Sequence, residues 1–256
     1  MPELILPSSL LDLAHGIALD AGELLMKRPS TFEISSKSTA IDIATQMDHD
    51  SEKLIVDSLL SARKDDGILG EEGTQRPSSS GITWVIDPID GTVNYLYALP
   101  GWSVSIAAKD AHGVVVGVVH APTIASTWTA IRGGGAFFNG HPIHCNEPIA
   151  LNRALIGTGF AYDTDLRVGQ GKVLASLLPQ IRDIRRMGSA AVDICNVATG
   201  LYDGYFELGL KEWDLAAAAL VASEAGALVS TDSEDLTCCA GPSLYPVLIQ
   251  ALARGK

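Results

Sequence analysis

The stretch that decides the fold of this chain is Thr83-Trp-Val-Ile-Asp-Pro-Ile-Asp-Gly-Thr-Val-Asn94. Its first part, Trp84 to Ile86, is a short apolar run typical of a strand buried on both faces. The strand is expected to stop at Asp87, because the proline that follows holds this residue extended. Asp87 and Asp90 therefore stand three residues apart at the end of a buried strand, where a turn can direct both carboxylates to one point.

The next two residues suit the approach of an anion. Gly91 has no Cβ, so a ligand can come close to the backbone, and the amides of Gly91 and Thr92 are expected at a helix start. Taken alone, Asp-Pro-x-Asp-Gly is a common turn. Two other acidic groups favour a site over a turn: Glu71-Glu72 follows a predicted strand at 68–69, and Asp214 opens a predicted helix.

Each acidic group also has a simple structural role, since Asp214 alone is an ordinary helix cap and Glu71-Glu72 alone is a solvated surface pair. Several acids gathered at strand ends would repel one another unless cations neutralised them. Hard oxygen ligands favour Mg²⁺ over zinc or copper. The pattern therefore predicts a magnesium site.

Upstream of this stretch, the spacing of apolar residues predicts two helices separated by a loop. The first helix begins at a capping box, Ser9-Leu-Leu-Asp12, and ends near Lys27. Residues 30–46 are rich in Ser and Thr without a helical period, which predicts an exposed loop. The second helix is expected to follow Asp48 and Asp50.

Downstream, alternating patterns separated by turn residues predict an antiparallel meander with strands at 103–108, 114–119 and 126–131. Asn139-Gly140 is a strong signal for a tight hairpin turn. The elements expected after residue 146 are strand 153–160, helices 170–179 and 189–199, strand 204–208, helix 214–224, and strands 227–230 and 245–250.

These elements predict the α/β class in two parts. Residues 1–145 are expected to form an N-terminal α+β subdomain that carries most of the metal ligands. Residues 146–256 are expected to form a C-terminal α/β subdomain that carries Asp214 and the substrate contacts.

Composition limits the possible functions. Hydrophobic residues make up 47% of the 256 residues and charged residues 19%, so the chain can bury a core. Lys and Arg number 18 against 30 Asp and Glu, which gives 18 − 30 = −12 and predicts no nucleic-acid partner. No Lys or Arg precedes Lys27, and the apolar run Leu215 to Ala222 is too short to span a bilayer. We therefore expect a cytoplasmic protein without a membrane partner.

Three segments together resemble the signatures of the inositol monophosphatase family, which are Mg²⁺-dependent, typically lithium-sensitive phosphatases. They are Gly70-Glu-Glu-Gly73, the stretch from Trp84 to Asn94, and Glu212-Trp-Asp-Leu-Ala-Ala-Ala218. The resemblance runs from about Lys37 to about Leu228. It implies a layered αβαβα sandwich of the sugar-phosphatase type, with two to three Mg²⁺ in each active site.

Carried over residue by residue, the resemblance implies that Glu71, Asp87 and the Ile89 carbonyl hold the first Mg²⁺. Asp87, Asp90 and Asp214 would hold the second, and a looser third ion would sit by Glu71 among waters. Such ions polarise the phosphoryl oxygens, lower the pKa of a bound water and stabilise the leaving alkoxide.

The resemblance also implies catalytic roles for Glu71, Thr92 and Asp48. Thr92 matches the threonine that orients the attacking water together with an upstream acid. That acid is Asp48 by its spacing from Lys37, and Asp50 is the alternative two residues further on. Lys37 itself is either a lysine of the loop that closes near the metals or a solvated loop lysine.

Substrate recognition follows from the same resemblance. Gly188-Ser189-Ala190 matches the segment whose backbone contacts the inositol ring, and Glu207 matches the acid that accepts a hydrogen bond from a ring hydroxyl. The substrate-binding residues it implies are Asp90, Gly91, Thr92, Gly188, Ser189, Ala190, Glu207 and Asp214.

The alcohol that carries the phosphate stays open. Val93 stands where histidinol phosphatases usually carry Lys, which favours the inositol branch, but Glu212 adds an acid near the leaving group. Arg185-Arg186 serves either a second phosphate or a solvated or dimer-interface role. Histidinol-phosphate phosphatase and fructose-1,6-bisphosphatase are therefore the alternatives within the family.

Two other classes of protein fit less well. A divalent-metal-binding structural module could use the same acids, but the Asp-containing turns lack the glycine and terminal Glu of an EF-hand loop. A dinucleotide enzyme would need G-x-G-x-x-G at a strand–helix junction, and neither Gly133-Gly-Gly135 nor Gly157-x-Gly159 completes this motif. We therefore expect hydrolysis of myo-inositol monophosphate to myo-inositol and phosphate, by in-line attack of a metal-activated water, in a homodimer.

Overall fold

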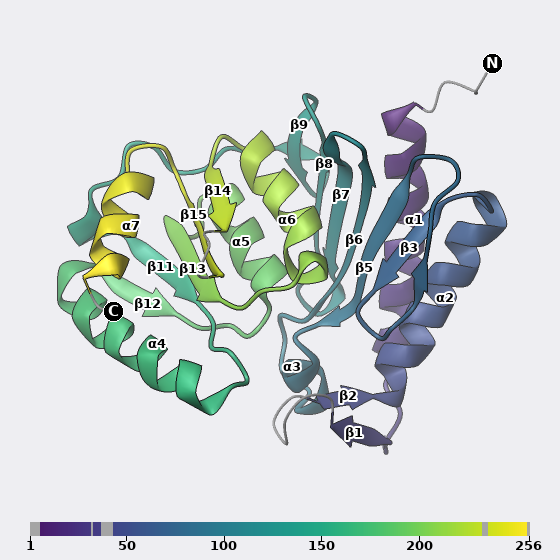
Figure 1. Cartoon of the computed structure of the whole chain (residues 1–256), viewed down its shortest axis with the longest axis horizontal. Coiled ribbons are helices and arrows are strands. Elements are labelled where there is room, and N and C mark those ends of the chain that lie inside the picture. Colours follow the sequence, from purple (N-terminus) through teal and green to yellow (C-terminus); the bar gives the residue numbers. More distant parts are fainter. Residues whose placement is uncertain (1–5, 32, 37–42, 232–234, 255–256) are drawn as a thin grey trace.

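The computed structural model describes residues 6–31, 33–36, 43–231 and 235–254 and has five layers (Figure 1). A pair of helices covers each outer face, two sheets lie inside these, and a third helix pair fills the middle. The helices are α1 (Pro7–Met26) and α2 (Gln46–Ala62) on one side, α5 (Ala190–Ala198) and α6 (Glu212–Glu224) in the middle, and α4 (Thr164–Leu177) and α7 (Tyr245–Ala253) on the other side. This arrangement confirms the expected α/β class and the αβαβα sandwich.

The first sheet has eight strands and confirms the predicted meander. They are β3 (Gly67–Gly70), β4 (Gln75–Arg76), β5 (Thr83–Asp90), β6 (Ser103–Asp110), β7 (Gly113–Ala121), β8 (Ser126–Ile131), β9 (Gly135–Phe138) and β10 (His141–Pro142), in the order β10-β9-β8-β7-β6-β5-β3-β4. Neighbours from β5 to β10 pair antiparallel, whereas β3 runs parallel to β5. Asn139 and Gly140 turn the last hairpin with φ of 48° and 79°, as predicted.

The second sheet has five strands in the order β12-β11-β13-β15-β14. They are β11 (Leu155–Thr158), β12 (Asp183–Arg185), β13 (Gly204–Leu208), β14 (Leu228–Thr231) and β15 (Leu236–Ala240). A short ribbon of β1 (Ile34–Ser36) and β2 (Ile43–Thr45), the five-residue helix α3 (Thr92–Leu96) and the 3₁₀ turns Pro122–Ile124, Leu151–Arg153 and Leu178–Gln180 complete the elements.

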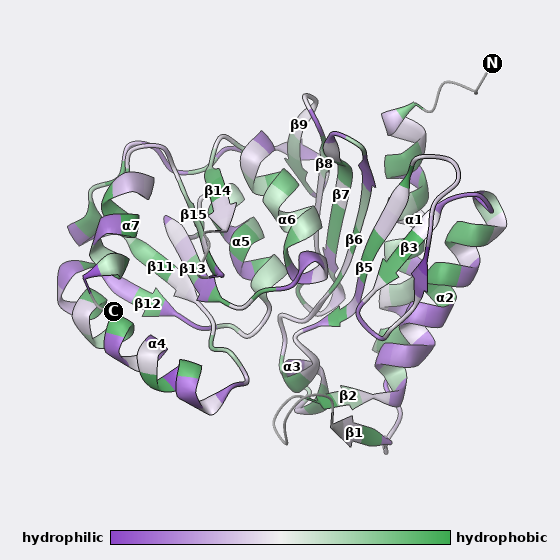
Figure 2. Cartoon of the chain, in the orientation of Figure 1, coloured by the Kyte–Doolittle hydropathy of each residue, from purple (hydrophilic) through white to green (hydrophobic). Residues whose placement is uncertain are grey.

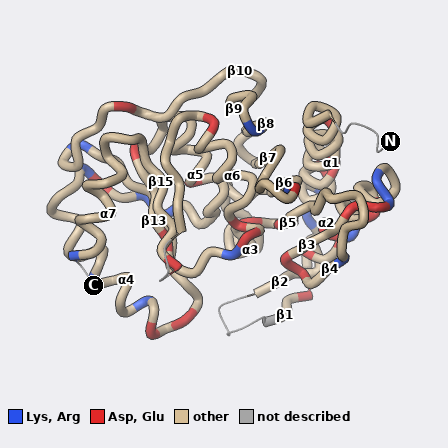
Figure 3. Tube along the Cα trace, turned by 45° about the horizontal axis from the view of Figure 1, so that its top comes forward, with Lys and Arg blue, Asp and Glu red and all other residues tan. Residues whose placement is uncertain are grey.

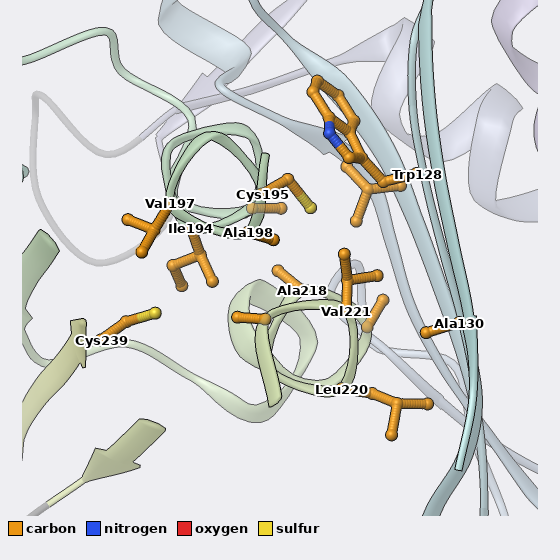
Figure 4. Close-up of a cluster of buried hydrophobic side chains, with 14 of the residues drawn as sticks. Trp128, Ala130, Ile194, Cys195, Val197, Ala198, Ala218, Leu220, Val221 and Cys239 are labelled. Atoms are coloured by element: carbon orange, nitrogen blue, oxygen red, sulfur yellow. The ribbon is translucent and has the colours of Figure 1, made fainter. Parts of the chain in front are cut away.

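Hydrophobic side chains join the layers through three cores. In the middle core, Trp128 and Ala130 of the first sheet meet α5 and α6 (Figure 4). The alanine-rich face of α6 lies so close to β7 that a Cβ on Gly117 would stand 2.7 Å from the Ala217 carbonyl oxygen. In Figure 2 the strands and the helix faces that meet them are mostly apolar. This close packing holds the start of α6 against the first sheet.

Several predicted boundaries are wrong. Helix α1 begins at Pro7, which lacks an N–H and suits the first helical position, and no side chain caps it, so the capping box at Ser9–Asp12 is wrong. Helix α2 begins at Gln46, before Asp48 instead of after it. The predicted loop 30–46 contains the strands of the short ribbon, although residues 37–42 lie outside the described part.

The C-terminal prediction also needs correction. Residues 245–250 form helix α7 instead of a strand, because Pro246 lies in its first turn and an apolar run this short fits either period. Strands β12 and β15 have no counterpart among the predicted elements. The division at residue 145 stays a prediction: α5 and α6 belong to the second part, yet they pack on the first sheet in one shared core.

Candidate active site

The decisive stretch lies at the end of β5, which continues through Asp90 instead of stopping at Asp87. The register against β6 shifts between Asp87 and Asp90, so the strand bulges there around Pro88. Both carboxylates are buried, with 1% of Asp87 and 8% of Asp90 exposed. Gly91 then adopts φ of +93°, a conformation that favours glycine, and α3 begins.

Glu71 reaches the same place because β3 runs parallel to β5. Gly70 lies opposite Ile86, so the carboxyl ends of both strands meet at one edge of the sheet. The Glu71 amide donates to the Ile86 carbonyl at 3.1 Å, which fixes the backbone of Glu71 beside Asp87.

Asp214 comes from the other side of the cleft, in the first turn of α6. Its Oδ2 accepts a hydrogen bond from the Lys211 amide at 2.6 Å. Ser105 of β6 donates to the Trp213 carbonyl at 3.4 Å, which ties this helix start to the first sheet. Figure 3 shows acidic positions in the middle of the molecule near α3 and β5.

These acids raise each other's pKa. Burial, followed by repulsion from Glu71, Asp90 and Asp214, holds the pKa of Asp87 well above its ordinary value, and Asp87 is hydrogen-bonded to Glu71. Burial and the Asp90 charge likewise raise the pKa of Asp214 well above its ordinary value. A hydrogen bond between two carboxyl groups needs a proton on one of them. At neutral pH the metal-free cluster therefore retains protons that separate acids would lose.

Asp90 is also held by the start of α5. Its carboxylate accepts hydrogen bonds from the Ser189 hydroxyl at 2.5 Å and from the amides of Ala190 and Ala191 at 3.3 and 2.7 Å. Burial raises the pKa of Asp90 to about 6 against the opposing effect of these hydrogen bonds. Here the predicted substrate segment 188–190 contacts a predicted metal ligand directly.

Thr92 and Asp48 are in direct contact. The Thr92 hydroxyl lies 3.1 Å from Asp48 Oδ1 and 3.1 Å from the Ile89 carbonyl oxygen. The other oxygen of Asp48 accepts from the amide and the hydroxyl of Thr45, both at 2.7 Å. Asp48 is fully buried, whereas Asp50 is exposed and hydrogen-bonds Gln46.

A cleft of about 460 Å³ adjoins this group of residues, although Asp48, Asp87 and Thr92 are not among the residues that line it. Its lining includes Glu71, Asp90, Gly91, Gly188, Ser189, Ala190, Glu207 and Asp214. Glu207 lies on β13, where the Tyr205 hydroxyl donates to it and Gly159 leaves room for it, since a Cβ there would stand 2.0 Å from the carboxylate. Burial raises the pKa of Glu207 to about 7.

Sequence reasoning missed two residues near this cleft, Asp193 and Glu52. Asp193 on α5 is 1% exposed, its Oδ1 has no hydrogen-bond partner among the described residues, and burial raises its pKa to about 8. Arg186, for which the sequence offered a second phosphate or a solvated or dimer-interface role, lines the cleft. Glu52 on α2 binds the loop that carries Glu71. An acid within an apolar helical run was the available signal for Asp193, whereas Glu52 stands among polar residues and offered no such signal.

The remaining predicted residues lie elsewhere. Glu212 forms an ion pair with Lys109 and does not line the cleft, and Arg185 pairs with Asp183 on the surface. Lys37 lies outside the described residues.

The donor set fits a divalent cation. It consists of carboxylate oxygens and the carbonyl of Ile89, which are the ligands that Mg²⁺ prefers. In the part of the chain that the structure describes, no three His, Cys, Asp or Glu side chains already stand in a ligand arrangement. Asp87 and Glu71 are hydrogen-bonded instead, and a cation would replace the proton between them.

The fold and this acidic cleft together define a phosphatase of the layered αβαβα type. The chain matches the model of the inositol monophosphatase family over residues 6–248 and belongs to that family. It is therefore a phosphoric monoester hydrolase that acts on small-molecule phosphates, in a family that is generally metal-dependent.

Similar proteins support this assignment. The chain is 38% identical to Inositol-1-monophosphatase SuhB of Mycobacterium tuberculosis over 97% of this chain and 94% of that protein. It is 40% identical to Nus factor SuhB of Pasteurella multocida over 86% and 84% of the two chains. The crystal structure of the extragenic suppressor protein suhB from Bartonella henselae superposes with a TM-score of 0.92 at 30% identity, over 97% of this chain and all (100%) of that one.

Among the described residues, the structure contains no helix whose length and hydrophobicity would let it span a bilayer.

Proposed function

We propose that this chain hydrolyses myo-inositol monophosphate to myo-inositol and phosphate with Mg²⁺ as its cation. The observation that carries the proposal is the convergence of mutually repelling acids from three separate elements, β3, β5 and α6, on one cleft. Glu71, Asp87, Asp90, Asp214 and the Ile89 carbonyl would hold two to three ions. Bound there, Mg²⁺ supplies charge to polarise the phosphoryl group, an acidified water and support for the leaving alkoxide.

Thr92 and Asp48 would orient the attacking water in line with the leaving group. A Thr92 hydroxyl that donates to Asp48 keeps its own lone pairs free to accept a hydrogen bond from the attacking water. Asp48 is anchored by Thr45, so Thr92 keeps a fixed direction. This pair supports a role for Asp48 instead of Asp50, and Glu71 would complete the catalytic set.

Glu207 would recognise the alcohol. It lines the same cleft as Asp90 and Asp214, and its carboxyl accepts from Tyr205 while facing that space. A carboxylate that accepts from ring hydroxyls suits a polyol, and Gly188, Ser189 and Ala190 would contact the ring from the start of α5. Glu212 pairs with Lys109 and does not line the cleft, so this acid gives no reason to prefer a different alcohol.

Initial rates on three substrates test this proposal. Inositol 1-phosphate, histidinol phosphate and fructose 1,6-bisphosphate are compared with Mg²⁺ and after chelation. We expect kcat/KM to be highest for inositol 1-phosphate and all rates to vanish without the metal. Preference for either other substrate would assign the chain to that alternative, and no phosphate release from any of them would favour a metal-binding module. Gel filtration with light scattering tests the proposed homodimer.

A further inference from the structure

Glu52 is a buried acid on α2 that binds the loop of residues 71–74, where β3 turns into β4. The side chain is 3% exposed. Its Oε2 accepts from the Glu72 amide at 2.9 Å, and its Oε1 accepts from the amide and the hydroxyl of Thr74 at 3.2 and 2.5 Å. Three donors of one short loop therefore converge on a single carboxylate.

The same carboxylate packs against the residue before Glu71. A Cβ on Gly70 would lie 2.3 Å from Glu52 Oε2, so only glycine fits here without displacing the acid. Both neighbours of Glu71 therefore contact Glu52. Gly70 packs against the Glu52 carboxylate, and the Glu72 amide donates a hydrogen bond to that same carboxylate. Any shift of Glu52 would move the backbone of Glu71.

Helix α2 carries Glu52 one turn after Asp48, on the same buried face. Asp48 contacts Thr92, while Glu52 contacts the loop of Glu71. One rigid helix therefore supports both halves of the site: the water-orienting pair and the acid that follows β3.

We propose that Glu52 is a positioning residue that sets the place of Glu71 and thereby the affinity of the cleft for a divalent cation. It does not touch the ion. This inference rests on the proposed function, because it needs a cation at Glu71. Residues that hold metal ligands in place typically change metal affinity about 10- to 100-fold when they are replaced.

Glu52→Gln is the direct test. Glutamine keeps the shape and one acceptor, but its NH₂ group would face an N–H donor of the loop. Mg²⁺ alone is titrated into the metal-stripped protein by calorimetry, and hydrolysis of inositol 1-phosphate is then measured against Mg²⁺ concentration. We expect the Mg²⁺ midpoint to rise about 10- to 100-fold. The KM for the ester should stay unchanged, and kcat should recover at saturating Mg²⁺.

Two other variants keep the test valid if Glu52→Gln does not fold. Thr74→Val removes one donor and should raise the midpoint less. Gly70→Ala pushes on the carboxylate from the other side and should raise the midpoint as well.

Asp66→Asn is the matched control. Asp66 is also buried, at 1% exposed, and it lies just before β3, where it accepts hydrogen bonds from Arg63, Ser80 and Trp84. Its replacement should lower the thermal midpoint and leave the Mg²⁺ midpoint at the wild-type value. An unchanged Mg²⁺ midpoint in folded Glu52 variants, or an equal shift in Asp66→Asn, would overturn the inference. A wild-type protein that binds no Mg²⁺ would overturn the proposed function and this inference with it.

Discussion

Acids are buried in two regions of this molecule, with opposite surroundings. Asp66 and Asp203 lie away from the cleft, and donors surround each of them: Arg63, Ser80 and Trp84 for Asp66, Asn146 and the Leu155 amide for Asp203. Asp87 and Asp214 lie at the cleft, where burial and then repulsion from other carboxylates raise their pKa. Donors compensate a structural acid from within the chain. The cleft acids also accept hydrogen bonds, but these do not offset their burial and mutual repulsion, so the cleft is suited to a cation from outside.

Asp214→Asn is expected to cause the largest loss of activity, and it separates the cleft acids from the structural acids most clearly. Activity should fall at least about 100-fold, because the variant loses a proposed ligand of the cation. The free energy of unfolding of the metal-free protein should hold or rise, because one repelling charge is gone and the amide oxygen still accepts from Lys211. Asp66→Asn should do the reverse, lowering stability and sparing kcat. Normal turnover of Asp214→Asn at saturating Mg²⁺ would remove Asp214 from the metal site.

Asp90→Asn should lose comparable activity but also stability. Asp90 accepts three hydrogen bonds from the start of α5, and an amide has only one oxygen to offer them. Thermal unfolding of both variants without metal checks this difference. Equal stability of the two would show that the contact of Asp90 with α5 contributes little to the fold.

Thr92→Val is expected to have the next largest effect: kcat should fall about 100-fold while substrate affinity stays nearly unchanged. In the proposed mechanism the hydroxyl acts through the attacking water, an interaction that matters mainly in the transition state. Steady-state kinetics at saturating Mg²⁺ separate the two constants. A raised KM with normal kcat would make Thr92 a phosphate or packing contact.

The pH dependence of stability without metal gives a smaller effect. The cleft acids have higher pKa values folded than unfolded, about 6 for Asp90 and about 7 for Glu207. Their contribution is fully present below about pH 4 and is lost as pH rises through these folded values. The free energy of unfolding should therefore fall by a few kcal/mol between about pH 4 and 7. Saturating Mg²⁺ should remove most of this fall, and a metal-free protein that is equally stable at both pH values would contradict the account.

Glu207→Gln should have the smallest effect of these variants. A hydrogen bond to a charged group is worth about 1.5–3 kcal/mol, so kcat/KM for inositol 1-phosphate should fall about 10- to 100-fold. A simple phosphomonoester without ring hydroxyls should lose much less. Equal losses on both substrates would show that Glu207 acts through the acid cluster.

Local patterns explain what the sequence could predict. Asp87, Asp90 and Gly91 lie within five residues of one another, and Asn139-Gly140 defines its own turn, so neighbouring residues decide both. The sequence of helix α7 predicts a strand because its short apolar run fits either period. The role of Glu52 is hidden from sequence for a different reason: its partner loop lies 20 residues away and meets it only after β3 pairs with β5.

Calorimetry of Mg²⁺ binding to the metal-stripped protein near pH 6.5, in two buffers of different ionisation enthalpy, tests the central claim most directly. If burial and mutual repulsion keep protons on the cleft acids, Mg²⁺ must displace those protons as it binds. We predict saturable binding with release of about one proton or more, and loss of this release in Asp214→Asn. Binding without proton release, or no binding at all, would contradict the account.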